Sequence, residues 1–145
     1  MNLNGACNAE LEMSFIHESE SVNAQSTIEL FEKIKANQPS GKLFIIADNA
    51  RYYRSNMVSE YLKRNKRVKR IFLPPYSPNL NLIERLWKFY KKEVLYNRYY
   101  PSFCDFKKAT HDYFESLQER KEDLIALLKD KFYFPHEKFS KPKFG

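Results

Sequence analysis

The sequence has 145 residues, of which 43% are hydrophobic, 16% aromatic and 30% charged, with a formal net charge of +7 and a pI near 9.3. Three glycines and this share of apolar residues exclude collagen-like, low-complexity and disordered proteins. No apolar run approaches the roughly 20 residues of a membrane span, and the chain does not open on a secretory signal. We therefore expect one small cytoplasmic domain with no membrane partner.

The residue types that bind soft metals are few and scattered. Cys7 and Cys104 are isolated, which excludes a disulfide scaffold, and both are expected to pack as small apolar side chains. The three histidines lack the spacing of a zinc site. A metal bound to this protein would therefore be held by oxygen ligands.

The first half of the chain predicts a hairpin, a helix and a strand. Alternating apolar and polar residues predict two strands within residues 3–16, around a turn at Asn8 and Ala9. Helical spacing predicts a helix over 23–37 that is capped by Asn23. The run LFIIA at 43–47 has no polar alternation, which predicts an interior strand buried on both faces.

The second half predicts mainly helices. Apolar residues at helical spacing predict helices over 55–65, 82–96 and 102–117, with a further amphipathic segment near 122–130. Trp87 and Tyr90 fall on the apolar stripe of the second of these and are expected in the core. Residues 68–73 are rich in β-forming side chains and end before two prolines, which predicts a strand. This order of elements is typical of an α/β domain with helices on both faces of a sheet.

The positive charge is concentrated in residues 51–70, which carry eight basic side chains and one acidic side chain. Tyrosines alternate with these basic residues, a mixture typical of surfaces that contact phosphates. A solvated helix face has the same composition, so both interpretations stay open. The candidates for DNA binding are Arg51, Arg54, Arg64, Lys66 and Arg67.

Two carboxylates are candidates for a metal site. Asp48 follows the LFIIA strand directly, at the end where ligands collect in α/β sheets, and Glu84 lies in the first turn of a later helix. Carboxylate oxygens bind Mg²⁺, and two such ions can support cleavage of a phosphodiester. Each residue also has a structural interpretation: Asp48 could cap a turn, and Asn81 with Glu84 has the spacing of a capping box.

The segments IIADNARYYRSNMV and VKRIFLPPYSPNLNLIERLWKFYKK, within residues 43–92, resemble the catalytic core of bacterial insertion-sequence transposases of the mariner type. Those enzymes belong to the DDE superfamily of endonucleases, which has a ribonuclease H-like fold. The match extends more weakly to GACN at 5–8. The resemblance implies metal-assisted cutting of DNA at the ends of an element and joining of the freed 3′ hydroxyl to a target.

The resemblance also implies roles for particular residues and partners. Asp48 and Glu84 correspond to the second and third metal ligands of the family. These ligands bind Mg²⁺, for which Mn²⁺ can substitute. Asn49 is expected to orient Asp48, and Arg51 and Arg54 to contact phosphates beside the site. The implied partners are DNA and either a second copy of the chain or the upstream half of a transposase, in a nucleoid-associated complex.

The sequence departs from the family pattern at two places. Tyr53 stands where a histidine is common, and the strand that carries the first catalytic Asp would lie upstream of Met1. We therefore expect residues 1–135 to form a partial catalytic domain whose ribonuclease H-like sheet lacks its first, central strand, and residues 136–145 to form a tail. The chain alone is expected to be inactive. A decayed remnant, one frame of a frameshifted gene and a misplaced start all fit, as does a non-catalytic fragment that binds DNA or dimerises.

Overall fold

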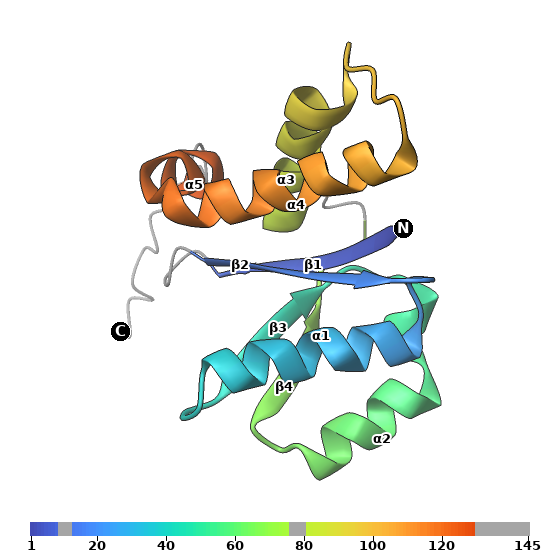
Figure 1. Cartoon of the computed structure of the whole chain (residues 1–145). Coiled ribbons are helices and arrows are strands. Elements are labelled where there is room, and N and C mark those ends of the chain that lie inside the picture. Colours follow the sequence, from blue (N-terminus) through green and yellow to red (C-terminus); the bar gives the residue numbers. More distant parts are fainter. Residues whose placement is uncertain (9–12, 76–80, 130–145) are drawn as a thin grey trace, which may run out of the picture.

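The computed structural model in Figure 1 describes residues 1–8, 13–75 and 81–129. Two strands come first, and the rest of the chain alternates helices with two more strands before ending in helices. This is the predicted α/β order. The predicted turn at Asn8 and Ala9 and the tail at 136–145 lie wholly or partly outside the described residues. No described helix is both long and apolar enough to cross a membrane.

The first two strands form the predicted hairpin. Strand β1 (Asn2–Asn8) pairs antiparallel with β2 (Met13–Ser19), with Gly5 opposite Ile16. Figure 1 shows α1 on one side of this hairpin and α3, α4 and α5 on the other. The hairpin is thus the layer between two groups of helices.

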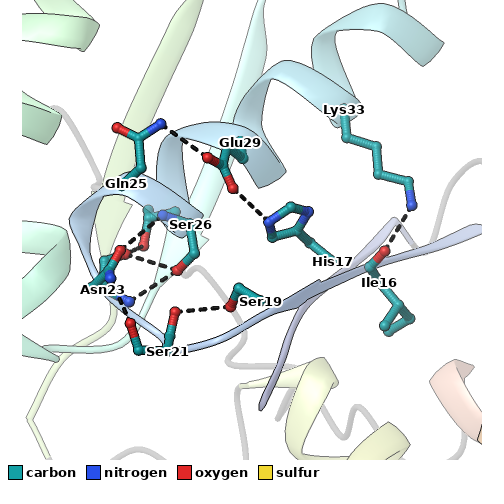
Figure 2. Close-up of polar contacts among 10 residues, drawn as sticks. Ile16, His17, Ser19, Ser21, Asn23, Gln25, Ser26, Glu29 and Lys33 are labelled. Atoms are coloured by element: carbon teal, nitrogen blue, oxygen red, sulfur yellow. Dashed lines mark hydrogen bonds and ion pairs between the residues drawn. The ribbon is translucent and has the colours of Figure 1, made fainter. Parts of the chain in front are cut away.

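Polar contacts hold β2 to helices on both sides, because successive side chains of a strand point to opposite faces. His17 Nε2 lies 2.7 Å from Glu29 Oε2 of α1, and Lys33 Nζ donates to the Ile16 carbonyl at 2.7 Å (Figure 2). On the other face, Glu18 accepts from Lys107 of α4 at 2.8 Å. The hairpin therefore has a fixed place between the helices.

Helix α1 (Ala24–Asn37) begins where the sequence predicts. The Asn23 side chain accepts from the Ser26 N–H at 3.0 Å, and the Asn23 N–H donates to Ser26 Oγ at 2.9 Å, as Figure 2 shows. This reciprocal pair satisfies backbone donors that have no partner within the helix. Leu30, Phe31 and Ile34 form its buried stripe.

The other two strands form a separate parallel sheet. Strand β3 (Leu43–Ala47) leads through a 3₁₀ turn, η1 (Arg51–Arg54), and helix α2 (Asn56–Arg64) to β4 (Val68–Phe72). Among the described residues, β1–β2 and β3–β4 are two sheets of two strands each.

The prediction that LFIIA is buried on both faces is wrong. Leu43 and Ala47 are buried on the face that carries the helices, but Phe44 is 63% exposed and Ile46 60% exposed on the opposite face. Ile71 of β4 adds to this open apolar face, with 48% of its surface exposed. Within the described residues, no layer covers that side of the sheet.

The helices after β4 cover the far side of the hairpin. Helix α3 (Leu82–Tyr90) continues as a π-helical turn, η3 (Lys91–Leu95), and is followed by α4 (Phe103–Glu119) and α5 (Lys121–Lys129). The prediction of a helix over 82–96 is confirmed, with a change of helical pitch at its end. Tyr90 is in the core as predicted, Trp87 is partly buried against it, and Tyr90 Oη pairs with Thr110 Oγ1 at 2.9 Å.

Gly5 allows β1 to pack closely against α3. A Cβ atom at this position would lie 2.9 Å from Trp87 Cζ2, 3.0 Å from Ile16 Cδ1 and 3.1 Å from Ile83 Cδ1. Those distances are too short for carbon atoms in contact, so only glycine fits without movement of its neighbours.

We expect Gly5→Ala to lower the free energy of unfolding by about 1–3 kcal/mol, because an added methyl group overpacks this contact. Chemical denaturation monitored by circular dichroism measures the change. Gly41→Asn is the control, since Gly41 has a φ of 80° and no heavy atom within 4 Å of its Cβ position, and asparagine tolerates positive φ. An equal or larger loss in the control would contradict the argument from packing.

Candidate active site

A cavity of about 620 Å³ lies between the hairpin and strand β3. Its walls come from residues 3–8 of β1, residues 42–48 in and beside β3, the tyrosines of η1 and the first turn of α3. Both Asp48 and Glu84 are on this wall. The fold therefore brings to one cavity two carboxylates that lie far apart in the sequence.

Asp48 is held in a defined orientation at the end of β3. Its Oδ1 accepts a hydrogen bond from the Ala50 N–H at 2.9 Å, which is the turn-capping role that the sequence left open. This bond uses one of the two carboxylate oxygens. The cap and a role in the cavity are thus compatible, because Oδ2 needs no part in the turn.

Glu84 takes no part in the capping box that its spacing suggested. Asn81 is the N-terminal cap residue of α3, but its side chain makes no capping hydrogen bond. Glu84 is exposed, and its carboxylate lies at the N-terminus of α3, where the helix dipole favours negative charge.

Tyr52 is a residue of the cavity that the sequence analysis missed. Burial raises the pKa of its hydroxyl, and the charges of Asp48 and Glu84 raise it further. Both carboxylates are therefore within electrostatic reach of one phenol. The signals in the sequence were its position four residues after Asp48 and its place among the basic residues of 51–70. Burial is also the main cause of the raised pKa of the adjacent Tyr53, the residue that replaces the family's histidine.

The described residues that line the cavity include two carboxylates, Asp48 and Glu84, and one thiol, that of Cys7, but no histidine. Within residues 1–8, 13–75 and 81–129, no group of three or more His, Cys, Asp and Glu side chains could hold a metal ion. Asp48 and Glu84 are thus a pair without a third acidic neighbour among the described residues.

Asn49 makes its hydrogen bonds away from Asp48. Its Nδ2 donates to the Leu73 carbonyl at 3.1 Å, and its Oδ1 accepts from Arg54 Nη2 at 2.5 Å. Asn49 therefore joins the loop after β3 to the end of β4 and holds one of the predicted phosphate contacts. Arg51 is exposed on η1, close to the cavity in sequence.

The other predicted DNA contacts lie at the opposite end of the sheet. Arg64, Lys66 and Arg67 precede β4, whereas Asp48 follows β3, and the two strands are parallel. Five residues of strand separate these ends by roughly 16 Å. The Arg67 guanidinium donates to three carbonyls after α1, those of Gln38, Pro39 and Gly41, so it stabilises the end of that helix. DNA binding by these residues stays a prediction.

Residues 1–107 match the family of DDE superfamily endonucleases, which is most of the chain. The chain belongs to this family. It is also similar to the insertion element IS630 uncharacterized 39 kDa protein of Shigella sonnei, with 29% identity over 91 residues. Those residues are 62% of this chain and 26% of that protein, so the chain spans about a quarter of the length of the curated relative it matches.

Membership of the DDE superfamily confirms the broader part of the resemblance seen in the sequence. The matched region contains both carboxylates and every basic residue that was predicted to contact DNA. The roles of these side chains, the mariner type and the metal stay predictions at this point.

The two cysteines of this DDE endonuclease differ in environment. Cys7 lines the cavity, and burial raises the pKa of its thiol to about 12. Cys104 is exposed at the start of α4, so the expectation that it packs as an apolar side chain is wrong.

We expect a maleimide or iodoacetamide reagent at neutral pH to modify Cys104 and to leave Cys7 largely unmodified, because the thiolate is the reactive species. Mass spectrometry of the labelled chain measures the two rates, with Cys104→Ser isolating Cys7. Unfolding the protein in denaturant should abolish the difference. Equal labelling rates in the folded chain would contradict this description of the cavity.

Proposed function

We propose that the chain is the catalytic part of a mariner-type transposase, which cuts DNA at the ends of an insertion sequence and joins the freed 3′ hydroxyl to a target. The observation that carries this proposal is the pair of carboxylates, Asp48 and Glu84, on the wall of one cavity in a DDE superfamily endonuclease. A further support is the concentration of basic residues directly after Asp48, which suits a DNA substrate.

The two carboxylates fit a hard divalent cation. Mg²⁺ binds proteins through one or two carboxylates and keeps waters or substrate phosphate oxygens as its remaining ligands. Asp48, through the oxygen that is free of the turn, and Glu84 would hold such an ion, and Mn²⁺ would replace it. When bound, the metal supplies activation of the attacking oxygen and stabilisation of the leaving oxygen.

The neighbouring residues prepare the site for an anionic substrate. The Ala50 N–H fixes the Asp48 carboxylate, so this ligand is oriented before any ion binds. Tyr52 is protonated at neutral pH, as an ordinary tyrosine is, and its raised pKa keeps it so beside the two carboxylates. It therefore serves at the cavity wall as a hydrogen-bond donor and adds no negative charge. Arg51 and Arg54 supply positive charge on the turn that follows.

Two carboxylates are too few to organise both metal ions of a phosphodiester-cleaving site. We infer that a further carboxylate comes from a strand outside these 145 residues. This strand would occupy the cavity between β1 and β3, which we call the groove. It would join the two small sheets into one ribonuclease H-like sheet. In this proposal the strand belongs to the upstream half of the transposase.

Two features of the groove support a strand as its occupant. Within the described residues, β1 pairs only with β2, and β3 pairs only with β4, so each has one edge without a ladder. Unpaired strand edges are templates for another strand. Asn4 of β1 lines the groove at 6% exposure, and its buried Nδ2 has no hydrogen-bond partner among the described residues. A backbone carbonyl of an added strand would satisfy this donor.

We expect Mn²⁺ to bind the chain weakly through Asp48 and Glu84, and Asp48→Asn or Glu84→Gln to weaken this binding at least about tenfold, because each removes a charged ligand. Electron paramagnetic resonance of free Mn²⁺ during titration measures the affinity. Glu60→Gln removes the same charge from α2, outside the cavity, and should change nothing. If Asp48→Asn and Glu84→Gln both bound Mn²⁺ as tightly as the wild-type chain does, the assignment of these two residues as metal ligands would be wrong.

We expect the chain alone to make no strand breaks in DNA with Mg²⁺ or Mn²⁺. When the chain is joined to, or co-expressed with, the upstream half of its transposase, we expect strand breaks to form. Nicking of a labelled duplex that carries the element's ends measures both states. Asp48→Asn should abolish cleavage by the joined protein. Cleavage by the 145-residue chain alone would overturn the inferred incompleteness, and DNA binding without cleavage by the joined protein would favour a non-catalytic fragment.

A further inference from the structure

Phe72, the last residue of β4, lies against two arginine side chains. The guanidinium carbon of Arg54 is 4.2 Å from the centre of the Phe72 ring, and that of Arg70 is 4.6 Å from it. Arg54 ends the turn η1, and Arg70 is on β4 itself, two residues before the ring. Two positive charges from different elements thus share one aromatic side chain, which we name the Arg54–Phe72–Arg70 cluster.

Neutral groups hold both guanidinium groups in place. Arg54 Nη2 donates to Asn49 Oδ1, and Asn49 is itself anchored to the Leu73 carbonyl. Arg70 Nη1 donates to the Tyr53 carbonyl. Each arginine uses one nitrogen in these bonds, so most of its N–H groups have no partner among the described residues and can bind a ligand. The stacking on Phe72 further restricts both side chains.

Among the described residues, no carboxylate neutralises the positive charge of the cluster. Neither Arg54 nor Arg70 forms an ion pair with a carboxylate in the part of the chain that the structure describes, whereas Lys35, Lys63, Lys107 and Arg120 each do so. Arg70 is partly buried, and both its burial and the charge of Arg54 lower its pKa. Holding two like charges together costs free energy that a bound anion would offset.

We propose that the Arg54–Phe72–Arg70 cluster binds one phosphodiester group of a DNA strand. The planar fork of a guanidinium matches the two free oxygens of a phosphodiester, and two forks fixed in advance lose little entropy on binding. Phe72 restricts where the anion can lie relative to the two forks. Of the two arginines in this cluster, only Arg54 was predicted from the sequence to contact a phosphate, and Arg70 was not among the candidates for DNA binding.

The position of the cluster gives it a function in the proposed reaction, and here the inference rests on the proposed function. Asn49, which holds Arg54, directly follows Asp48, and Leu73, which anchors Asn49, donates its N–H to the Ala47 carbonyl at 2.8 Å. A phosphate on the cluster is therefore next to the carboxylate end of the cavity. The cluster would hold a phosphate beside the one that is cut, and so position the strand.

The test compares Arg70→Gln, Arg54→Gln and the double variant with Lys69→Gln. Lys69 is the matched control because it loses the same charge from the adjacent residue, whose side chain points to the open face of the sheet. Fluorescence anisotropy with a short DNA duplex, at salt concentrations from about 50 to 200 mM, measures affinity and its salt dependence.

Each single arginine variant should weaken binding at low salt about tenfold more than Lys69→Gln does. The double variant should lose less than the product of the two single losses, because both arginines hold one phosphate, and its salt slope should fall by about one. Arg70→Lys, which keeps the charge without the fork, should bind between wild type and Arg70→Gln. The proposal would be overturned if Arg70→Gln weakened DNA binding no more than Lys69→Gln does. It would also be overturned if the loss of affinity in the double variant equalled the product of the two single losses.

A second measurement guards against variants that fail to fold. Inorganic phosphate should raise the melting temperature of the wild-type chain more than chloride of equal ionic strength does, and should not do so for the double variant. Stabilisation by phosphate with unchanged DNA affinity in the arginine variants would assign the cluster to a small phosphate compound and refute DNA as its ligand. Failure of the proposed function would give a different result from failure of the cluster. If the proposed function is wrong, Asp48→Asn leaves cleavage by the joined protein intact.

Discussion

The close contact between β1 and α3 at Gly5 is the constraint on which the site depends. Ile83 and Trp87 of α3 reach this glycine, and Glu84 follows Ile83 directly. The missing Cβ lets the start of α3 approach the hairpin, so Glu84 reaches the wall of the same cavity as Asp48. The other carboxylate is fixed by β3 and by the Ala50 N–H. A backbone position without any functional group thus helps to bring two carboxylates to the wall of one cavity.

The two halves of the molecule are each packed, but the boundary between them is open. One buried cluster centres on α1, β3 and β4, and the other on α3, α4 and α5. The hairpin contributes to both, through Phe15 on one side and Leu3 and Ile16 on the other. Between the halves lie the cavity, one edge each of β1 and β3, and the buried amide of Asn4. In the part of the chain that the structure describes, neither edge pairs with another strand and Asn4 Nδ2 has no hydrogen-bond partner. The two candidate metal ligands and these strand edges therefore lie around the same cavity.

Local patterns in the sequence were sufficient to predict the helices and strands, but not to predict what packs against them. Helical spacing and the Asn23 cap predicted α1 because both act within a few residues. The exposure of Phe44 and Ile46 depends on what covers a sheet face, which apolarity alone does not encode. The Leu73 carbonyl bound by Asn49 and the carbonyls bound by Arg67 come from segments more than twenty residues away. Tyr52 was not predicted as a cavity residue because Asp48 and Glu84, whose charges help to raise its pKa, reach one cavity only in the fold.

The open face of β3 and β4 has a consequence for handling the protein. Phe44 and Ile46 protrude beside a strand edge of high β-propensity, a combination that promotes intermolecular sheet formation. Lys69, opposite Phe44 across the two strands, places a solvated charge in the middle of this face and opposes such stacking. When the protein is concentrated, the exposed apolar residues of this face therefore favour association between copies, and the charge of Lys69 opposes it.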